Sequence, residues 1–195
     1  MSSIDIEAID SVFRQVQREV WIVTAADGQR RGGLVATWVS QSSIDPESPQ
    51  AVIAIAANHF TAELIDAAHC FALHLITADQ IDLAWRFCMG SGRDRDKLAG
   101  LETTVAKTGC PILTDCLAWL DCKVISRHDT GDRIFYWADV VAGQLIGQGT
   151  PLREQELMAT ATPEQKSQLL GSLKDDLQIQ RPLRQHWRDG LTGQS

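Results

Sequence analysis

The chain has 195 residues and a net charge of −7, from 18 lysines and arginines and 25 aspartates and glutamates. This balance argues against nucleic acid or an anionic membrane surface as the main partner. Hydrophobic residues make up 44% of the chain, and no apolar run approaches the roughly 18 residues of a membrane span, so a globular, non-membrane protein is expected. The N-terminus lacks the basic and apolar regions of a signal peptide, and we predict a cytoplasmic location.

Hydrophobic periodicity predicts a β-rich protein with a few helices. Apolar residues at intervals of three and four indicate helices, whereas short apolar runs bounded by turn residues indicate strands. Closure of the mostly antiparallel strands into a barrel would remove their unpaired edges. The expected helices are residues 3–19, 61–68 and 77–87, and the expected strands are residues 20–24, 33–40, 51–56, 71–76, 117–127 and 133–146.

Local signals support several of these boundaries. Asp27 and Gly28 form a tight-turn signal that makes the first two strands a hairpin. Thr61 is the expected N-cap of the second helix, and Thr77 with Gln80 fits a capping box at the start of the third.

The composition changes after Thr150 to glutamine, glutamate, lysine and leucine. Pro163 occupies the first position of a helix expected to run to about residue 178, and Pro182 is expected to stop and redirect the chain. An apolar stripe on this helix needs a surface to cover it: Leu169, Leu170, Leu173 and Leu177. We therefore divide the chain into a barrel domain, residues 1–150, and a helical tail, residues 151–195, that packs on the barrel or on a dimer partner.

The five cysteines include no Cys-x-x-Cys pair, which indicates reduced and mostly buried thiols. A zinc site could be drawn from His69, Cys70, His74 and Cys88, but the two-residue cysteine spacing of structural zinc sites is missing. Packing roles are favoured for these side chains, and no metal is expected. Because catalytic triads, phosphate loops and nucleotide-binding glycine motifs are also missing, an organic cofactor is expected to carry any chemistry.

Two segments have the composition of a ligand site. Residues 36–43 are small and hydroxyl-bearing around Trp38, so a planar ligand can approach the backbone there; the simpler interpretation is a polar edge strand that enters a turn. Residues 58–61 end a buried strand and start a helix, where free amides bind anions; the simpler interpretation is an ordinary helix cap. A nearby loop either adds positive charge or is merely solvated, and its basic residues are Arg93, Arg95 and Lys97.

The chain resembles the flavin reductase-like family from about residue 13 to residue 146. Residues 33–40 resemble the family's Gly-(apolar)-Thr-Ala-Ser segment, residues 71–76 its Phe-Val-Val-Asn-Val-Leu strand, and residues 108–113 a signature late in the domain. The resemblance implies an FMN-binding, antiparallel Greek-key split β-barrel with short helices, followed here by the helical tail.

The resemblance also implies which residues hold the flavin. The ring system would lie against Val35, Ala36, Thr37, Trp38, Ser40 and Gln41, and the ribityl-phosphate end would contact Asn58, His59, Phe60 and Thr61, with Arg93 and Lys97 adding charge. The chain departs from the family at Val35, which replaces a threonine, and at His74, which replaces an asparagine. Arg133 replaces the histidine of a Gly-Asp-His motif near the nicotinamide, and we assign it the catalytic position.

The implied function is hydride transfer from NADH or NADPH to FMN, with FAD as the alternative flavin. Electrons would pass to free flavin or to a partner oxygenase, and a homodimer is expected. The alternative is a non-enzymatic FMN electron-transfer module reduced by a protein partner, which the loss of the Gly-Asp-His motif favours. A third interpretation is a protein that keeps the fold but binds no flavin.

Overall fold

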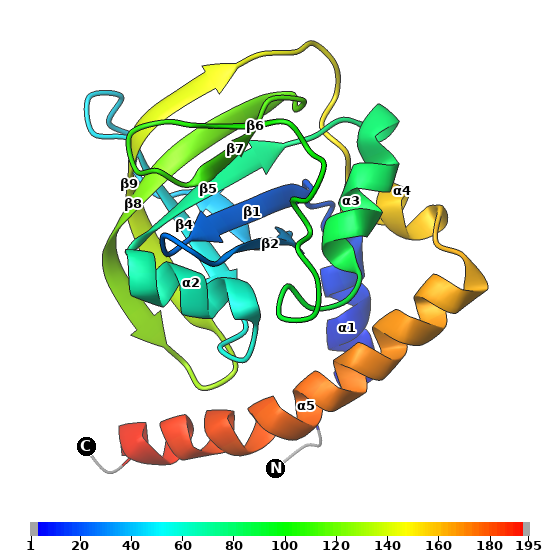
Figure 1. Ribbon diagram of the computed structural model, residues 1–195. Helices are drawn as coiled ribbons and strands as arrows, with labels where there is room; N and C mark the ends of the chain where they lie inside the picture. The colour runs from blue at the N-terminus through cyan, green and yellow to red at the C-terminus, as the bar shows by residue number, and fades with distance from the viewer. Residues whose placement is uncertain (1–3, 193–195) are drawn as a thin grey trace.

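A curled, seven-stranded antiparallel sheet forms the centre of the protein, which a computed structural model describes over residues 4–192 (Figure 1). Its strand order is β2-β1-β5-β8-β9-β4-β3. The strands are β1 Trp21–Ala26, β2 Arg31–Ala36, β3 Val39–Gln41, β4 Gln50–Ile55, β5 Cys70–Leu75, β8 Ala118–Asp129 and β9 Ile134–Leu145, with a separate two-stranded ladder of β6 Thr103–Val105 and β7 Pro111–Leu113. The predicted antiparallel split barrel is confirmed.

The single strand predicted at residues 33–40 is wrong, because the structure divides it in two. β2 pairs with β1 across the hairpin turn at Gly28, whose φ is +95°, and ends at Ala36. β3 then begins at Val39 and pairs with β4 at the opposite edge of the sheet. Thr37 and Trp38 therefore carry the chain across the seam of the barrel, the gap where the end of β2 approaches β4. Continuous β-propensity in the sequence concealed this crossing.

Two apolar clusters line the two faces of the sheet. The first is enclosed by strands of the barrel and by α2 (Phe60–Ala68), and it contains the large buried side chains Phe71 and Tyr136. The second joins β1 to α3 (Ile81–Cys88) and α4 (Glu154–Ala159) through residues such as Ile22, Phe87 and Leu157. None of the helices in residues 4–192 is long and apolar enough to cross a membrane.

The helix starts agree only in part with the prediction. α1 spans Ile6–Gln15 with Asp5 as its N-cap, so it is shorter than the predicted 3–19, and Ser3 lies outside the described residues. The capping box before α3 is present, because Gln80 Oε1 accepts from the Thr77 amide at 3.2 Å in a 3₁₀ turn, Ala78–Gln80. The predicted cap at Thr61 is wrong: α2 starts one residue earlier, and Thr61 is a helix residue with 2% of its surface exposed.

The long helix α5 spans Pro163–Thr192 and runs along one end of the barrel (Figure 1). The predicted stop at Pro182 is wrong, since the helix continues for ten residues beyond it. Proline removes one backbone hydrogen bond, but side chains on both sides of Pro182 hold α5 against the barrel. Before it, Gln180 accepts from Arg133 at 2.8 Å. Trp187 meets the ring of His128 edge-on at 6.4 Å, and Arg184 lies 3.9 Å from the carboxylate of Asp132.

Candidate functional site

The seam between β2 and β4 opens into a small cavity of about 150 Å³. It is lined by small side chains at the end of β2 and β4, including Ala36 and Ala54, and by Trp38, which is 48% exposed. The guanidinium of Arg133, from the turn between β8 and β9, lies 5.4 Å from the centre of the Trp38 ring. The lining residues are Leu34, Val35, Ala36, Thr37, Trp38, Ala54, Ile55, Ala56, His59 and Arg133.

A second cavity, of about 540 Å³, begins where α2 starts. The ring of Phe60 lies between the guanidinium groups of Arg30 and Arg93, each 5.8 Å from its centre. Gly92 allows this packing, because a Cβ there would lie 2.7 Å from the Phe60 ring. Arg93 also donates to the Asn58 carbonyl oxygen at 3.1 Å and pairs with Glu63, so its position is fixed.

The segment Asn58-His59-Phe60 connects the two cavities. His59 lines the first and Phe60 lines the second. In the described chain, the side chain of His59 makes no capping hydrogen bond to α2. The Ala62 amide donates to the His59 carbonyl oxygen at 3.0 Å, so the amides of Phe60 and Thr61 are the ones available to an anion. The residues that line the two cavities thus offer apolar surface at one end and arginines with free amides at the other, which suits a ligand with a planar apolar part and an anionic end.

α5 contributes two residues that the sequence analysis missed. Asp176 accepts from Asn58 Nδ2 at 2.7 Å and lies 3.2 Å from His59 Nε2. Gln180, one turn further along and almost completely buried, donates to Asn58 Oδ1 at 3.2 Å and accepts from Arg133 at 2.8 Å. Their spacing of four residues shows that they share a helix face, but the sequence holds no signal for what that face contacts.

The structure brings together most, but not all, of the residues predicted to bind flavin. Ser40 and Gln41 line a separate cavity of about 410 Å³ whose floor includes Leu73 and Val140. Lys97 lies outside these cavities: only 4% of it is exposed, and its Nζ donates to the Phe87 carbonyl oxygen at 2.7 Å. Burial lowers the pKa of Lys97 to about 8.

His74, one of the departures from the family pattern, has a structural role. It is fully buried in β5, its Nδ1 lies 3.0 Å from the Ile22 carbonyl oxygen, and its Nε2 accepts from the Leu113 amide at 3.1 Å. Burial lowers the pKa of His74 to about 4, so the ring is neutral at pH 7. A neutral imidazole offers one donor and one acceptor, as an asparagine amide does, and this accounts for the exchange. Among residues 4–192, no three His, Cys, Asp or Glu side chains gather as a metal site requires.

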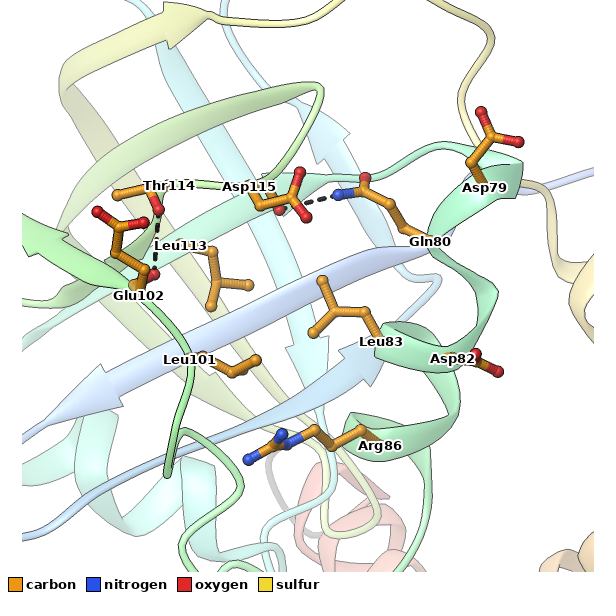
Figure 2. Close-up of a pocket in the computed structure, with 10 residues that line it drawn as sticks. All are labelled: Asp79, Gln80, Asp82, Leu83, Arg86, Leu101, Glu102, Leu113, Thr114 and Asp115. Atoms are coloured by element: carbon orange, nitrogen blue, oxygen red, sulfur yellow. Dashed lines mark hydrogen bonds between the residues drawn. The ribbon is translucent and has the colours of Figure 1, made fainter.

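A further cavity, of about 360 Å³, lies between α3 and the chain around β6 and β7 (Figure 2). Its floor is formed by Leu83, Leu101 and Leu113, and four carboxylates stand around it. Arg86 also lines the cavity, but its guanidinium is held by the Lys97 and Ala99 carbonyl oxygens, to which it donates. The acidic rim disfavours an anionic cofactor here, so the seam is the better candidate for a flavin.

The split barrel and the seam cavity together define a flavin reductase-like protein. The flavin reductase like domain model matches residues 13–156, and the chain belongs to this family. The family is one of flavin-dependent redox proteins.

Particular relatives refine this assignment. Diflavin flavoprotein A 1 of Synechocystis sp. is 29% identical over 138 residues, which are 70% of this chain and 24% of the relative, so the chain spans about a quarter of that protein's length. Nitrilotriacetate monooxygenase component B of Mycobacterium thermoresistibile has a similar structure, with a TM-score of 0.66, 26% identity, and coverage of 80% of this chain and 92% of that one. An FMN-binding protein of Thermus thermophilus has a TM-score of 0.62 at 25% identity and covers 67% of this chain and 71% of its own.

Proposed function

We propose that the chain is a cytoplasmic FMN-binding flavin reductase that takes hydride from NADH or NADPH and passes electrons to free flavin or to an oxygenase. The observation that carries this proposal is the joining of the seam cavity to an anion-accepting helix start through Asn58-His59-Phe60. The similar FMN-binding protein and monooxygenase component support the cofactor and the partner class. FAD is the alternative flavin.

Each part of the site has a role in this proposal. The backbone of residues 35–37 and the face of Trp38 hold the planar ring, while the first turn of α2 and Arg93 hold the phosphate. When bound, the flavin supplies the hydride-accepting chemistry. Arg133 stands over Trp38 at the mouth of the cavity, where it orients the nicotinamide nucleotide. Val35 offers no hydroxyl, so hydrogen bonds at that edge of the ring come from backbone groups.

The proposal includes the helical tail, because α5 reaches the part of the site proposed to hold the flavin phosphate. The carboxylate of Asp176 lies against Asn58 and His59, and a negative charge there repels a phosphate. We propose that the tail, residues 151–195, covers the barrel domain, residues 1–150, and that this part of α5 moves aside when flavin binds.

The test is a titration of the flavin-free full chain with FMN and, separately, with FAD, followed by NADH or NADPH under anaerobic conditions. The proposal expects FMN to bind and its visible absorbance to bleach on addition of one of the two nucleotides. Failure of FMN and FAD to bind would show that only the fold has been kept, and would overturn the proposed cofactor.

A non-enzymatic electron-transfer module is the second candidate. The hydrogen bond of Arg133 to Gln180 favours it, because an arginine already occupied by the tail is less available to a nucleotide. This chain matches about a quarter of a longer relative, a diflavin flavoprotein. That arrangement also supports electron transfer from this domain to another flavin domain. In this case FMN binds and chemical reductant bleaches it, but neither nucleotide does.

We also propose a homodimer, supported by the apolar residues of α1. Ile6, Val12 and Phe13 are all more than half exposed, and Leu170 and Leu173 of α5 are exposed as well. A two-fold interface would cover such surfaces. Light scattering on the full chain and on Phe13→Asp is the test, with Glu7→Gln on the same helix as the control. The dimer is expected to dissociate only in Phe13→Asp, and a monomeric full chain would exclude it.

A further inference from the structure

Two cysteines that the proposed function does not use lie in direct contact. The Sγ of Cys110 donates to the Sγ of Cys70 at 3.2 Å, between positions 40 residues apart in the chain. Cys70 is the first residue of β5, and Cys110 immediately precedes β7. They lie in a small apolar cluster with Ala72 and Ile112, and 7% of Cys70 is exposed whereas Cys110 is fully buried.

The segment that carries Cys110 is fixed on both sides. Thr108 donates to the buried Asp121 from its amide at 2.9 Å and from its hydroxyl at 2.5 Å. Gly109 has a φ of +85°, which turns the chain, and the Pro111 carbonyl oxygen accepts from Thr24 at 2.5 Å. The two sulfurs are therefore held together by the fold on each side of the pair. The same contacts explain the family signature at residues 108–113 as structural.

The pair is chemically asymmetric. The hydrogen bond from the Cys110 thiol lowers the pKa of Cys70, because it stabilises the Cys70 thiolate. The same contact, together with burial, raises the pKa of Cys110. Burial also raises the pKa of Cys122 and Cys116. Cys70, with 7% of its surface exposed, thus combines a lowered pKa with a neighbouring thiol, which are the properties of a reactive cysteine and its resolving partner.

We propose that Cys70 and Cys110 form a peroxide-sensitive dithiol that closes to an intramolecular disulfide. The Cys70 thiolate attacks one oxygen of hydrogen peroxide, the O–O bond breaks, and water leaves after protonation, so that Cys70 becomes a sulfenic acid. The Cys110 sulfur then attacks the Cys70 sulfur, the S–O bond breaks, and the departing hydroxide takes the Cys110 proton as water. Two thiols are oxidised and one peroxide is reduced to two waters.

The movement needed is small. A disulfide bond is about 2.05 Å long, so the sulfurs must approach by roughly 1 Å from their observed separation. The site is independent of the seam cavity, and the proposal goes beyond the proposed flavin function: it holds whether or not the protein binds flavin.

The test counts thiols in the reduced full chain before and after a short exposure to hydrogen peroxide, with alkylation under denaturing conditions and peptide mapping. The proposal expects the five free cysteines to fall to three, with the Cys70 and Cys110 peptides joined and both thiols restored by dithiothreitol. Five thiols remaining, or a disulfide between any other pair, would overturn it.

Variants test the order of the steps. In Cys110→Ser, peroxide is expected to leave a sulfenic acid on Cys70 that dimedone labels, whereas the intact pair yields little adduct because Cys110 consumes it. The matched control is Cys122→Ser, which removes another buried thiol and should still lose two thiols to the disulfide. Equal labelling of Cys70 in the intact chain and in Cys110→Ser would exclude Cys110 as the resolving residue. Peptide mapping of the unmutated chain decides the proposal if a variant fails to fold.

Discussion

Gln180 accepts a 2.8 Å hydrogen bond from Arg133 and, through its amide nitrogen, donates to Asn58 at 3.2 Å. The buried side chain of Gln180 thereby links Arg133, which is proposed to contact the nicotinamide, to Asn58 at the proposed phosphate end. Four contacts to three barrel residues come from Asp176 and Gln180 alone. The position of α5 and the occupancy of the flavin site are therefore expected to depend on each other.

Replacing Asp176 with asparagine is expected to tighten FMN binding. The change removes a negative charge from the phosphate end but keeps a side chain of the same size. Because the carboxylate is partly exposed, we expect an effect of about 1 kcal/mol, or about fivefold in Kd, that shrinks at high salt. Fluorescence titration measures it. The control is Asp175→Asn, the exposed neighbour on α5, and equal affinities for the two variants would contradict a role for Asp176.

Trp38→Leu is expected to weaken FMN binding or slow flavin reduction. The substitution removes a flat aromatic face from the cavity and the contact with the Arg133 guanidinium, each worth about 1 kcal/mol. The matched control is Trp137→Leu, since Trp137 stacks on Phe135 in β9. If Trp38→Leu behaves like the control in affinity and in anaerobic stopped-flow reduction, then Trp38 only packs.

Stability is expected to fall in mild acid because of His74. Its pKa is lowered by burial to about 4 in the folded state, against about 6.5 in an unfolded chain. The neutral ring therefore contributes stability that is fully present above pH 6.5 and is lost as the pH falls toward 4, by about 3 kcal/mol. Urea unfolding across this range measures the loss. His74→Asn should be less sensitive to pH over the same interval, and an unchanged slope would assign the sensitivity to other groups.

Gly131→Ala is expected to loosen α5. A Cβ at Gly131 would collide with the Leu183 backbone, and the φ of +87° is unfavourable for alanine. Gly28→Ala is a matched control, because Gly28 has a φ of +95° in another hairpin turn but an added Cβ there meets nothing within 4 Å. Both variants should lose about 1–2 kcal/mol from backbone strain. Only Gly131→Ala should also expose α5 to proteolysis and tighten FMN binding; similar proteolysis of both would contradict the role of this contact.

Most strands of the seven-stranded sheet are predictable because their pattern is local, whereas the short strands β3, β6 and β7 are not, and the site depends on contacts distant in sequence. The hairpin at Gly28 and the capping box at Thr77 each arise within a few residues, and both were predicted correctly. The division of one apolar run at Thr37 and Trp38 depends on which strands pair at the two sheet edges, and no local signal marks it.

The incorrect predictions for Pro182 and Lys97 have a similar origin. Pro182 is a strong local stop signal, but tertiary contacts on both sides outweigh it. Lys97 looks like a solvated cation in sequence, yet the carbonyl oxygen of Phe87 holds it in the interior. Asp176 and Gln180 lie more than a hundred residues from Asn58, so only the folded chain brings them to the site.

The seam lets a bound ligand stabilise two strands that are not neighbours in the sheet. β2 and β3 are the two free edges of the sheet, and only Thr37 and Trp38 connect them. A rigid molecule bound in the seam cavity would contact both β2 and β4. The free energy of its binding would then be added to the free energy needed to separate the two strands. Amide exchange in β2 and β4 should then slow together when the ligand is present, although the two strands share no hydrogen bonds in the sheet.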